Sequence, residues 1–344
     1  DITRKQVQQL IENNPSEIEE AFYKDLDFGT GGMRGIMGPG TNRINKYTIG
    51  KANAGLANYL NEQFTGDISV AIAYDSRNLS DYFAMVSAQV LSAQGIKVYL
   101  FKELRPTPEL SFAVRQLKCQ AGIVVTASHN PKEYNGYKVY WDDGGQLVPP
   151  HDKGVIDKVN AIERFDNINF SGNDALIEMI DSVIDIPYSE KVAELINRET
   201  PRDSNVSLVY TSLHGSGITM IPKILEKCGF TNLHIVEEQA VPDGNFPTVE
   251  SPNPEEKTAL KMALELAKKI DADLLFGTDP DCDRVGLAVK NKTGKWILLN
   301  GNEAGTILIN YLLEKTPVEA YSNSFICKTI VTTRLIDKMA AAHK

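Results

Sequence analysis

The chain has 344 residues, of which 42% are hydrophobic and 24% charged, and its net charge is −9. This length exceeds one ordinary core, so the composition predicts a soluble globular protein of two or three domains. The acidic balance argues against wholesale nucleic-acid binding, and an anionic substrate would need a local basic pocket.

The cysteines indicate a reducing compartment. Cys119, Cys228, Cys282 and Cys327 are widely separated, and no pair has the spacing of metal ligands. We therefore expect reduced thiols and a cytoplasmic location. We expect neither a membrane span nor a signal peptide, because no apolar run is long enough. The first residue is Asp1 rather than Met, which suggests a trimmed N-terminus.

The first half of the chain alternates between helical and strand patterns. Helices are predicted over 3–24 with an interruption at Pro15, over 45–65, over 81–93 and from Pro106; strands are predicted over 69–74, 97–100 and 121–125. This alternation predicts a parallel sheet covered by helices. Asp75-Ser76-Arg77 stands at the end of the first of these strands.

The glycine-rich segment 28–35 (Phe-Gly-Thr-Gly-Gly-Met-Arg-Gly) allows several interpretations. It is not a P-loop, because no Gly-Lys-Ser/Thr follows. It is a poor dinucleotide fingerprint, because Arg34 replaces the third glycine and no clear strand precedes it. It is either a backbone nest from which Arg34 reaches an anion, or a flexible glycine loop.

A serine follows the apolar strand 121–125, within the segment 126–131 (Thr-Ala-Ser-His-Asn-Pro). Chemistry in α/β proteins usually sits at such strand ends. A serine hydrolase is disfavoured, because a histidine adjacent to Ser128 usually points away from it and the nucleophile-elbow pattern is absent. The aromatic alternation over 133–141 predicts a strand, with a tight turn at Asn135-Gly136 and with Lys138 facing the serine or the solvent.

The second half repeats the α/β plan after the chain leaves the first domain near residues 184–187. Strands are predicted over 207–211, 233–236 and 273–277, with one helix ending at Cys228 and a long helix over 254–270. The segment 213–217 (Leu-His-Gly-Ser-Gly) follows the first of these strands. For His214 within it, as for most isolated histidines, a structural role is the simplest explanation.

Three carboxylates follow the strand 273–277, in the segment 279–284 (Asp-Pro-Asp-Cys-Asp-Arg). Alternate positions of an extended loop project to one side, and a divalent cation is the natural counter-charge for such a cluster. An exposed acidic turn is the simpler alternative. An EF-hand is excluded, because Arg284 stands where glycine is needed and Lys290 where glutamate is needed. A phosphatase with an aspartate nucleophile is the runner-up, but it leaves Ser128 unexplained.

Serine, carboxylates and basic side chains combine into one chemistry, phosphoryl transfer. This reaction needs a phosphate carrier, a cation that neutralises developing charge, and cationic clamps. Ser128 can carry the phosphate and the three aspartates can hold Mg²⁺. Arg34, Lys138 and Arg284 can contact phosphate or assist proton transfer.

The segments 29–35, 126–131 and 279–284 together resemble the α-D-phosphohexomutase superfamily, most closely its bacterial phosphoglucomutase/phosphomannomutase members. The resemblance covers the whole chain. It implies tandem α/β domains, each with a mixed, mostly parallel sheet covered by helices. These would be domain I over 1–186, domain II over 187–298 and the start of an incomplete domain III over 299–344.

The resemblance implies a phosphoserine at Ser128 and one Mg²⁺ per active site, bound by Ser128 with Asp279, Asp281 and Asp283. The phosphoenzyme would donate its phosphoryl group to a hexose monophosphate. The bisphosphorylated hexose that forms would reorient and return its other phosphate to the serine. Hexose 1- and 6-phosphates would thus be interconverted, with glucose expected and mannose as the alternative.

Other residues gain roles from the same resemblance. Lys138 matches a lysine proposed as general base, and His129 and Arg34 match residues near the phosphoryl group. Arg284 matches a residue that lines the active site. His214 falls on a second-domain His-Gly loop, which implies a contact with substrate or phosphate.

The departures from the family pattern concern its C-terminal half. Family members have four domains, with a sugar-specificity loop in the third and a Ser-Gly-Thr phosphate loop in the fourth, and neither loop occurs here. The segment 301–305 lacks the serine of the sugar loop and is instead predicted to start a helix. We therefore expect a fragment that binds Mg²⁺ and phosphate with little turnover. A phosphopentomutase of the same family remains an alternative.

Overall fold

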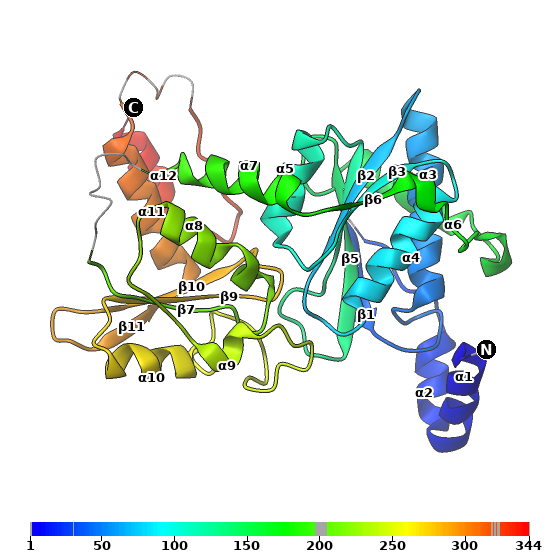
Figure 1. The fold of residues 1–344 in the computed structure, drawn as a ribbon, viewed down its shortest axis with the longest axis horizontal. Helices are drawn as coiled ribbons and strands as arrows, with labels where there is room; N and C mark the ends of the chain where they lie inside the picture. Colours follow the sequence, from blue (N-terminus) through cyan, green and yellow to red (C-terminus); the bar gives the residue numbers. More distant parts are fainter. Residues whose placement is uncertain are drawn as a thin grey trace.

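The computed structural model of the chain describes residues 2–29, 31–196, 205–317, 319, 321 and 324–343. It contains two α/β units, each built around one mixed sheet (Figure 1). The strands of the first sheet are, in spatial order, β1 (Gly32–Ile36), β5 (Tyr134–Trp141), β4 (Ala121–Val125), β2 (Ser69–Tyr74), β3 (Lys97–Phe101) and β6 (Ile177–Ile180). Those of the second are β11 (Trp296–Leu299), β10 (Val285–Lys290), β9 (Leu274–Thr278), β7 (Leu208–Thr211) and β8 (Leu233–Ile235). The predicted α/β class with tandem mixed sheets is confirmed.

The pairing of the first sheet determines where its strands end. Strands β4, β2, β3 and β6 run parallel to one another, whereas β5 is antiparallel to both β4 and β1. The carboxyl ends of β2 and β4 therefore meet at one edge, so the loops that follow Tyr74 and Val125 lie side by side. Lys138 on β5 pairs with Val124 on one side and with Gly32 on the other, which places it near the same edge.

Helices cover both faces of the first sheet. One face packs against α3 (Lys46–Gln63), α4 (Ser80–Ser92) and α6 (His151–Asn160), and the other packs against α5 (Thr107–Gln116). Alternate strand residues point to opposite faces, so Ile72 joins the first core cluster and Ala73 the second. The predicted interruption at Pro15 is confirmed by two helices, α1 (Ile2–Asn13) and α2 (Pro15–Phe22), because proline fits the first turn of a new helix.

The second sheet packs against α10 (Lys261–Lys269), whose Ala263 and Ala267 join the core with Leu275. The predicted helix over 254–270 is wrong at its start, because the Asn253 side chain accepts the Glu255 N–H and holds the chain in a turn. Further α-helices are α8 (Ile221–Lys227), α9 (Glu237–Ala240), α11 (Gly301–Lys315) and α12 (Leu335–Ala342). Short 3₁₀ turns lie at Phe165–Asn167, Asp174–Leu176 and Ser216–Thr219.

Two local predictions about the first unit are wrong. The segment Gly32–Ile36 is a strand rather than a loop, and Gly32 is needed there because a Cβ would lie 1.9 Å from the Tyr137 carbonyl oxygen. The pair Asn135-Gly136 lies inside β5 and makes no tight turn. Gly136 permits a close approach of backbones, since a Cβ would lie 2.5 Å from the Thr126 carbonyl oxygen.

Helix α7 (Ser182–Ala193) lies between the two units and packs against α5 and α8 (Figure 1). Arg105, just before α5, donates two hydrogen bonds of 2.9 Å to the Asp185 carboxylate on α7. Arg105 is 4% exposed, and this buried, bidentate ion pair connects α7 to the first unit. The domain boundaries at 186 and 298 fall within α7 and β11 and stay predictions.

Glu109 on α5 predicts a pH-dependent stability. It is fully buried, neither carboxylate oxygen has a hydrogen-bond partner, and burial together with neighbouring Asp185 raises its pKa from 4.5 to about 9. The native state therefore holds a proton that the unfolded chain releases, so this group lowers stability as pH rises between these pKa values. From pH 5 to pH 8, we expect Glu109→Gln to gain roughly 3–4 kcal/mol of unfolding free energy relative to wild type.

Urea unfolding at the two pH values measures this gain. As a control, Glu178→Gln on β6, where the side chain is 54% exposed, should follow the wild-type pH dependence. Parallel curves for Glu109→Gln and wild type would show that Glu109 is already ionised in the folded protein.

No disulfide joins the four cysteines, all of which lie in the described ranges. Within the described ranges, no helix is both long enough and apolar enough to cross a membrane.

Candidate active site

The loop after β4 holds Ser128 in a left-handed backbone conformation, with φ of +54°. A non-glycine residue in this region costs about 1–3 kcal/mol, so the surrounding structure must hold it there. The Ser128 N–H donates to Thr126 Oγ1 at 2.8 Å, and the Ser128 carbonyl accepts from Arg77 Nη2 at 2.6 Å. The residue is 2% exposed. Both of its peptide groups are therefore fixed, and its hydroxyl has a defined direction.

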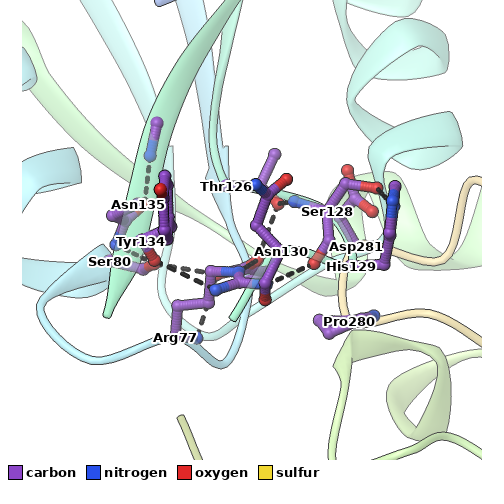
Figure 2. Close-up of polar contacts among 12 residues, drawn as sticks. Arg77, Ser80, Thr126, Ser128, His129, Asn130, Tyr134, Asn135, Pro280 and Asp281 are labelled. Atoms are coloured by element: carbon purple, nitrogen blue, oxygen red, sulfur yellow. Dashed lines mark hydrogen bonds and ion pairs between the residues drawn. The ribbon is translucent and has the colours of Figure 1, made fainter. Parts of the chain in front are cut away.

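The loop after β2 supplies these fixing groups through Asp75 and Arg77. Thr126 Oγ1 donates to Asp75 Oδ2 at 2.6 Å, which completes a chain from the carboxylate to the Ser128 N–H. Burial raises the pKa of Asp75 despite the nearby Arg77 charge. Figure 2 shows the Arg77 guanidinium against the loop between β4 and β5, residues 126–133, here called the serine loop. It donates to the carbonyl oxygens of Ser128, Asn130 and Pro131 in this loop and of Tyr134 at the start of β5.

Asp75 and Arg77 are residues that the sequence placed at a strand end without assigning a function. The available signal was the parallel order of the strands 69–74 and 121–125, because neighbouring parallel strands bring their carboxyl ends together.

The acidic loop, residues 279–283, joins β9 to β10 in the second unit. Asp279 Oδ1 accepts the backbone N–H groups of Asp283 and Arg284 at 3.2 and 3.0 Å, which folds the loop back on itself. Carboxylate oxygens of Asp279, Asp281 and Asp283 lie within 4.8 Å of one another. The predicted clustering of the three carboxylates is therefore present in the structure.

The two units meet where the serine loop touches the acidic loop. Ser128 Oγ donates to Asp279 Oδ2 at 2.8 Å. Lys138 Nζ donates to Asp281 Oδ2 at 2.7 Å and to Asp283 Oδ2 at 2.8 Å. Groups that are far apart in the sequence thus form one cluster, as the combined chemistry predicted.

The acidic loop fits a divalent cation. Asp281 is fully buried, and its Oδ1 has no hydrogen-bond partner. An unpaired buried carboxylate oxygen is costly, and three carboxylates beside the Ser128 hydroxyl are the hard oxygen ligands that Mg²⁺ prefers. Burial, with the charges of Asp281 and Asp283, raises the pKa of Asp279 to about 8. A bound cation would remove this penalty by neutralising the cluster.

Lys138 provides part of the counter-charge. Burial lowers its pKa, but the carboxylates of Asp281 and Asp283 outweigh burial and raise the pKa above its ordinary value. Conversely, burial raises the pKa of Asp281, but Lys138 outweighs it and lowers this pKa. Lys138 is therefore held as an ammonium ion in this arrangement.

Two further predicted residues lie around the serine. His129 Nδ1 lies 3.2 Å from Ser128 Oγ, and burial, followed by the charges of Arg284 and Arg34, lowers the His129 pKa. Arg34 Nη1 donates to Asn130 Oδ1 at 2.6 Å, and the Arg284 side chain is exposed next to the acidic loop. The charges of Arg284 and Arg34 thus act on the imidazole that lies beside the serine hydroxyl.

A cavity of about 300 Å³ opens beside this cluster. Its lining includes Gly31, Gly32, Arg34, Thr126, Lys138 and Gln146. Two cationic side chains and the glycine backbone make it suitable for a phosphorylated ligand. Thr30 of the same glycine-rich motif lies outside the described residues.

His214 does not face the serine loop. It is 1% exposed, and its Nδ1 and Nε2 lie 2.9 Å from the Val241 carbonyl oxygen and from Thr248 Oγ1 respectively. A contact with substrate would require these bonds to break, so the position of His214 supports a structural role.

Two neighbours of the acidic loop were not predicted. Thr107, at the start of α5, donates its N–H to the Asp281 carbonyl at 2.8 Å and its hydroxyl to Asp281 Oδ2 at 3.2 Å. Ser216 donates both its N–H and its hydroxyl to the Pro280 carbonyl at 2.8 Å. The only sequence signals were a helix start after Pro106 and a Gly-Ser-Gly turn, and neither identifies its partner.

Comparison with known proteins assigns both units. Residues 25–165 match the phosphoglucomutase/phosphomannomutase α/β/α domain I, and residues 187–294 match domain II. A phosphoglucomutase of Staphylococcus haemolyticus is 41% identical over 331 residues, which are 95% of this chain and 59% of that protein. A phosphoglucomutase of Staphylococcus epidermidis is 39% identical over 342 residues, which are 98% and 62% of the two chains.

Solved structures agree on the fold. A phosphoglucomutase/phosphomannomutase family protein from Burkholderia thailandensis has a TM-score of 0.70 at 22% identity, covering 91% of this chain and 63% of that one. The phosphoglucomutase parafusin from Paramecium has a TM-score of 0.66 at 16% identity, covering 93% and 62%.

The chain spans about three fifths of the length of the curated relatives that it matches. Two domain matches in the family order, together with these relatives, carry the assignment. The chain belongs to the α-D-phosphohexomutase superfamily and contains its α/β/α domains I and II.

Proposed function

We propose that the protein is a phosphohexomutase that interconverts hexose 1-phosphate and hexose 6-phosphate through a phosphoserine at Ser128. The observation that carries this proposal is the 2.8 Å hydrogen bond from Ser128 Oγ to Asp279 across the two units. It places a buried, backbone-fixed hydroxyl directly against a three-carboxylate cluster. The phosphoglucomutase relatives favour glucose as the hexose.

The proposed reaction has two transfers at one oxygen. In the first, the bond between Ser128 Oγ and phosphorus breaks as a hydroxyl oxygen of the hexose monophosphate bonds to that phosphorus, and the hydroxyl proton passes to Ser128 Oγ. In the second, Ser128 Oγ bonds to the phosphorus of the other phosphate of the bisphosphorylated hexose, the bond from that phosphorus to the sugar oxygen breaks, and the serine proton passes to this sugar oxygen. Mg²⁺ bound by Ser128, Asp279, Asp281 and Asp283 would neutralise charge on the transferring group.

Several side chains could assist these transfers. Arg34 and Lys138 line the adjacent cavity and can hold phosphoryl oxygens, and His129 lies beside the hydroxyl. Arg284 is exposed next to the acidic loop and can meet the substrate. The general-base role of Lys138 stays a prediction, because its ion pairs to Asp281 and Asp283 favour the protonated form.

A coupled assay tests the proposal. With Mg²⁺ and catalytic glucose 1,6-bisphosphate, we expect glucose 1-phosphate to be converted to glucose 6-phosphate, detected through a dehydrogenase. Mannose 1-phosphate should react more slowly and ribose 1-phosphate slowest. Assaying the 344-residue chain also tests the expectation of little turnover. A cytoplasmic location is part of the same proposal.

Release of inorganic phosphate without isomerisation would support the aspartate-nucleophile phosphatase instead. The site geometry does not favour that alternative, because Asp279 is fully buried and both of its carboxylate oxygens already accept hydrogen bonds.

A further inference from the structure

We propose that Arg77 is a positioning residue for phosphoryl transfer. Phe246 packs on Arg77, and through this contact the geometry of the serine loop depends on how the second unit packs against the first. The inference rests on the proposed function, because it concerns the rate at which Ser128 accepts and donates a phosphoryl group. Arg77 does not touch the reacting atoms. It acts through the backbone of the loop that carries them.

The guanidinium organises the whole serine loop. Its side chain has no exposed surface, and it donates four hydrogen bonds to carbonyl oxygens between Ser128 and Tyr134 (Figure 2). Its fifth donor, Nε, lies 3.4 Å from Asp75 Oδ2. Nε makes no hydrogen bond, so the four bonds to the loop come from the two terminal nitrogens of the planar fork, a pattern that lysine cannot reproduce with three donors on one atom.

Phe246 of the second unit covers this guanidinium. Its ring centroid lies 5.1 Å from the Arg77 guanidinium carbon, and Phe246 is 2% exposed. The contact is a buried cation–π interaction. The backbones also approach closely: a Cβ on Gly244 would lie 2.2 Å from the Asn78 nitrogen, and Asn78 Nδ2 donates to Asn245 Oδ1 at 3.1 Å. The segment 244–246 thus fits directly onto the Arg77 loop.

The same segment connects to the acidic loop within the second unit. The Asp243 N–H donates to the His214 carbonyl at 3.2 Å, and Ser216, two residues further along this turn, holds the Pro280 carbonyl. A contiguous set of contacts therefore begins at Pro280 of the acidic loop and passes through the turn at residues 214–216 to the segment 243–246. From Phe246 it continues to Arg77 and then to Ser128. Misplacement of Arg77 would leave the carboxylates where they are but shift the serine hydroxyl relative to them.

Single-turnover transfer from labelled glucose 1,6-bisphosphate to Ser128 tests this role. Arg77→Lys keeps the charge but loses the fork, so we expect the transfer rate to fall about a hundredfold, with the KM for the bisphosphate within about threefold. Arg105→Lys is the matched control, because Arg105 is also buried and bidentate but contacts Asp185 rather than the serine loop. It should lower the melting temperature similarly and keep the rate within about threefold of wild type.

Phe246→Leu tests the coupling while leaving Arg77 in place, and it carries the test alone if Arg77→Lys does not fold. We expect about a tenfold slower transfer, and little further loss when it is combined with Arg77→Lys.

Each outcome points to one conclusion. Equal losses of transfer rate in Arg77→Lys and Arg105→Lys would show that Arg77 stabilises the fold and does not position the serine. Multiplicative effects of Arg77→Lys and Phe246→Leu, or a wild-type rate in Phe246→Leu, would overturn the coupling. No labelling of the wild-type protein would instead contradict the proposed function.

Discussion

Replacing Ser128 with alanine is expected to lower mutase turnover by at least about a thousandfold, because no other group can carry the phosphoryl group at this position. The hydroxyl oxygen is the atom to which phosphorus bonds in both proposed transfers. His129, although only 3.2 Å from it, is fixed by the same loop and does not occupy the position next to Asp279. The coupled glucose 1-phosphate assay measures the loss.

Ser87→Ala is the matched control for this prediction. Ser87 is also a fully buried serine, but it lies on α4, where its hydroxyl donates to the Phe83 carbonyl at 2.8 Å and accepts from Asn53 Nδ2 at 2.9 Å. Its loss should cost about 1 kcal/mol of stability and leave turnover unchanged. Turnover by Ser128→Ala comparable to that of Ser87→Ala would rule out Ser128 as the phosphate carrier.

Replacing Asp281 with asparagine is expected to reduce both cation affinity and turnover. Its Oδ1 is a buried carboxylate oxygen without a hydrogen-bond partner, and its negative charge is what an oxygen-ligated cation needs most. We expect Mg²⁺ affinity to fall at least about tenfold and turnover about 100- to 1,000-fold, since one electrostatic group lost from a buried site has effects of this size. Calorimetric titration with Mg²⁺ and with Mn²⁺ measures the affinity independently of turnover.

Asp271→Asn is the control for the titration. Asp271 lies near the same sheet and pairs with Lys290, but its side chain is 92% exposed. This variant should bind Mg²⁺ as wild type does. Unchanged Mg²⁺ affinity in Asp281→Asn would mean that the acidic loop is not the cation site, and that Lys138 alone balances its charge.

The features of the fold that depend on the pattern of apolar and polar side chains could be predicted from the sequence. The strands 69–74 and 121–125 were visible as apolar runs, and their parallel order placed Ser128 at a sheet edge. The meeting of Ser128 with Asp279 could be predicted only by chemistry and resemblance, because no local signal connects the two units. The wrong predictions lie where backbone contacts decide: Gly32 and Gly136 looked like loop and turn residues but are strand positions with close neighbours.

Arg77 shows why part of the site could not be predicted. Its hydrogen-bond acceptors are backbone carbonyls, which every residue has, so no residue type in the loop indicates the interaction. Phe246 likewise looks like an ordinary core residue until the two units are packed together. His214 is the opposite case, since a motif suggested a ligand contact whereas both ring nitrogens have partners within its own unit, and the ligand contact stays a prediction.

Locating the transferred phosphate tests the central claim of this account most directly. The protein is incubated with Mg²⁺ and glucose 1,6-bisphosphate labelled in both phosphates, digested, and the labelled peptide is sequenced by mass spectrometry. The account predicts one labelled site, Ser128, whose label is lost on adding unlabelled glucose 6-phosphate and appears in bisphosphorylated sugar. An acid-stable label elsewhere, or an acyl phosphate on Asp279, would contradict it.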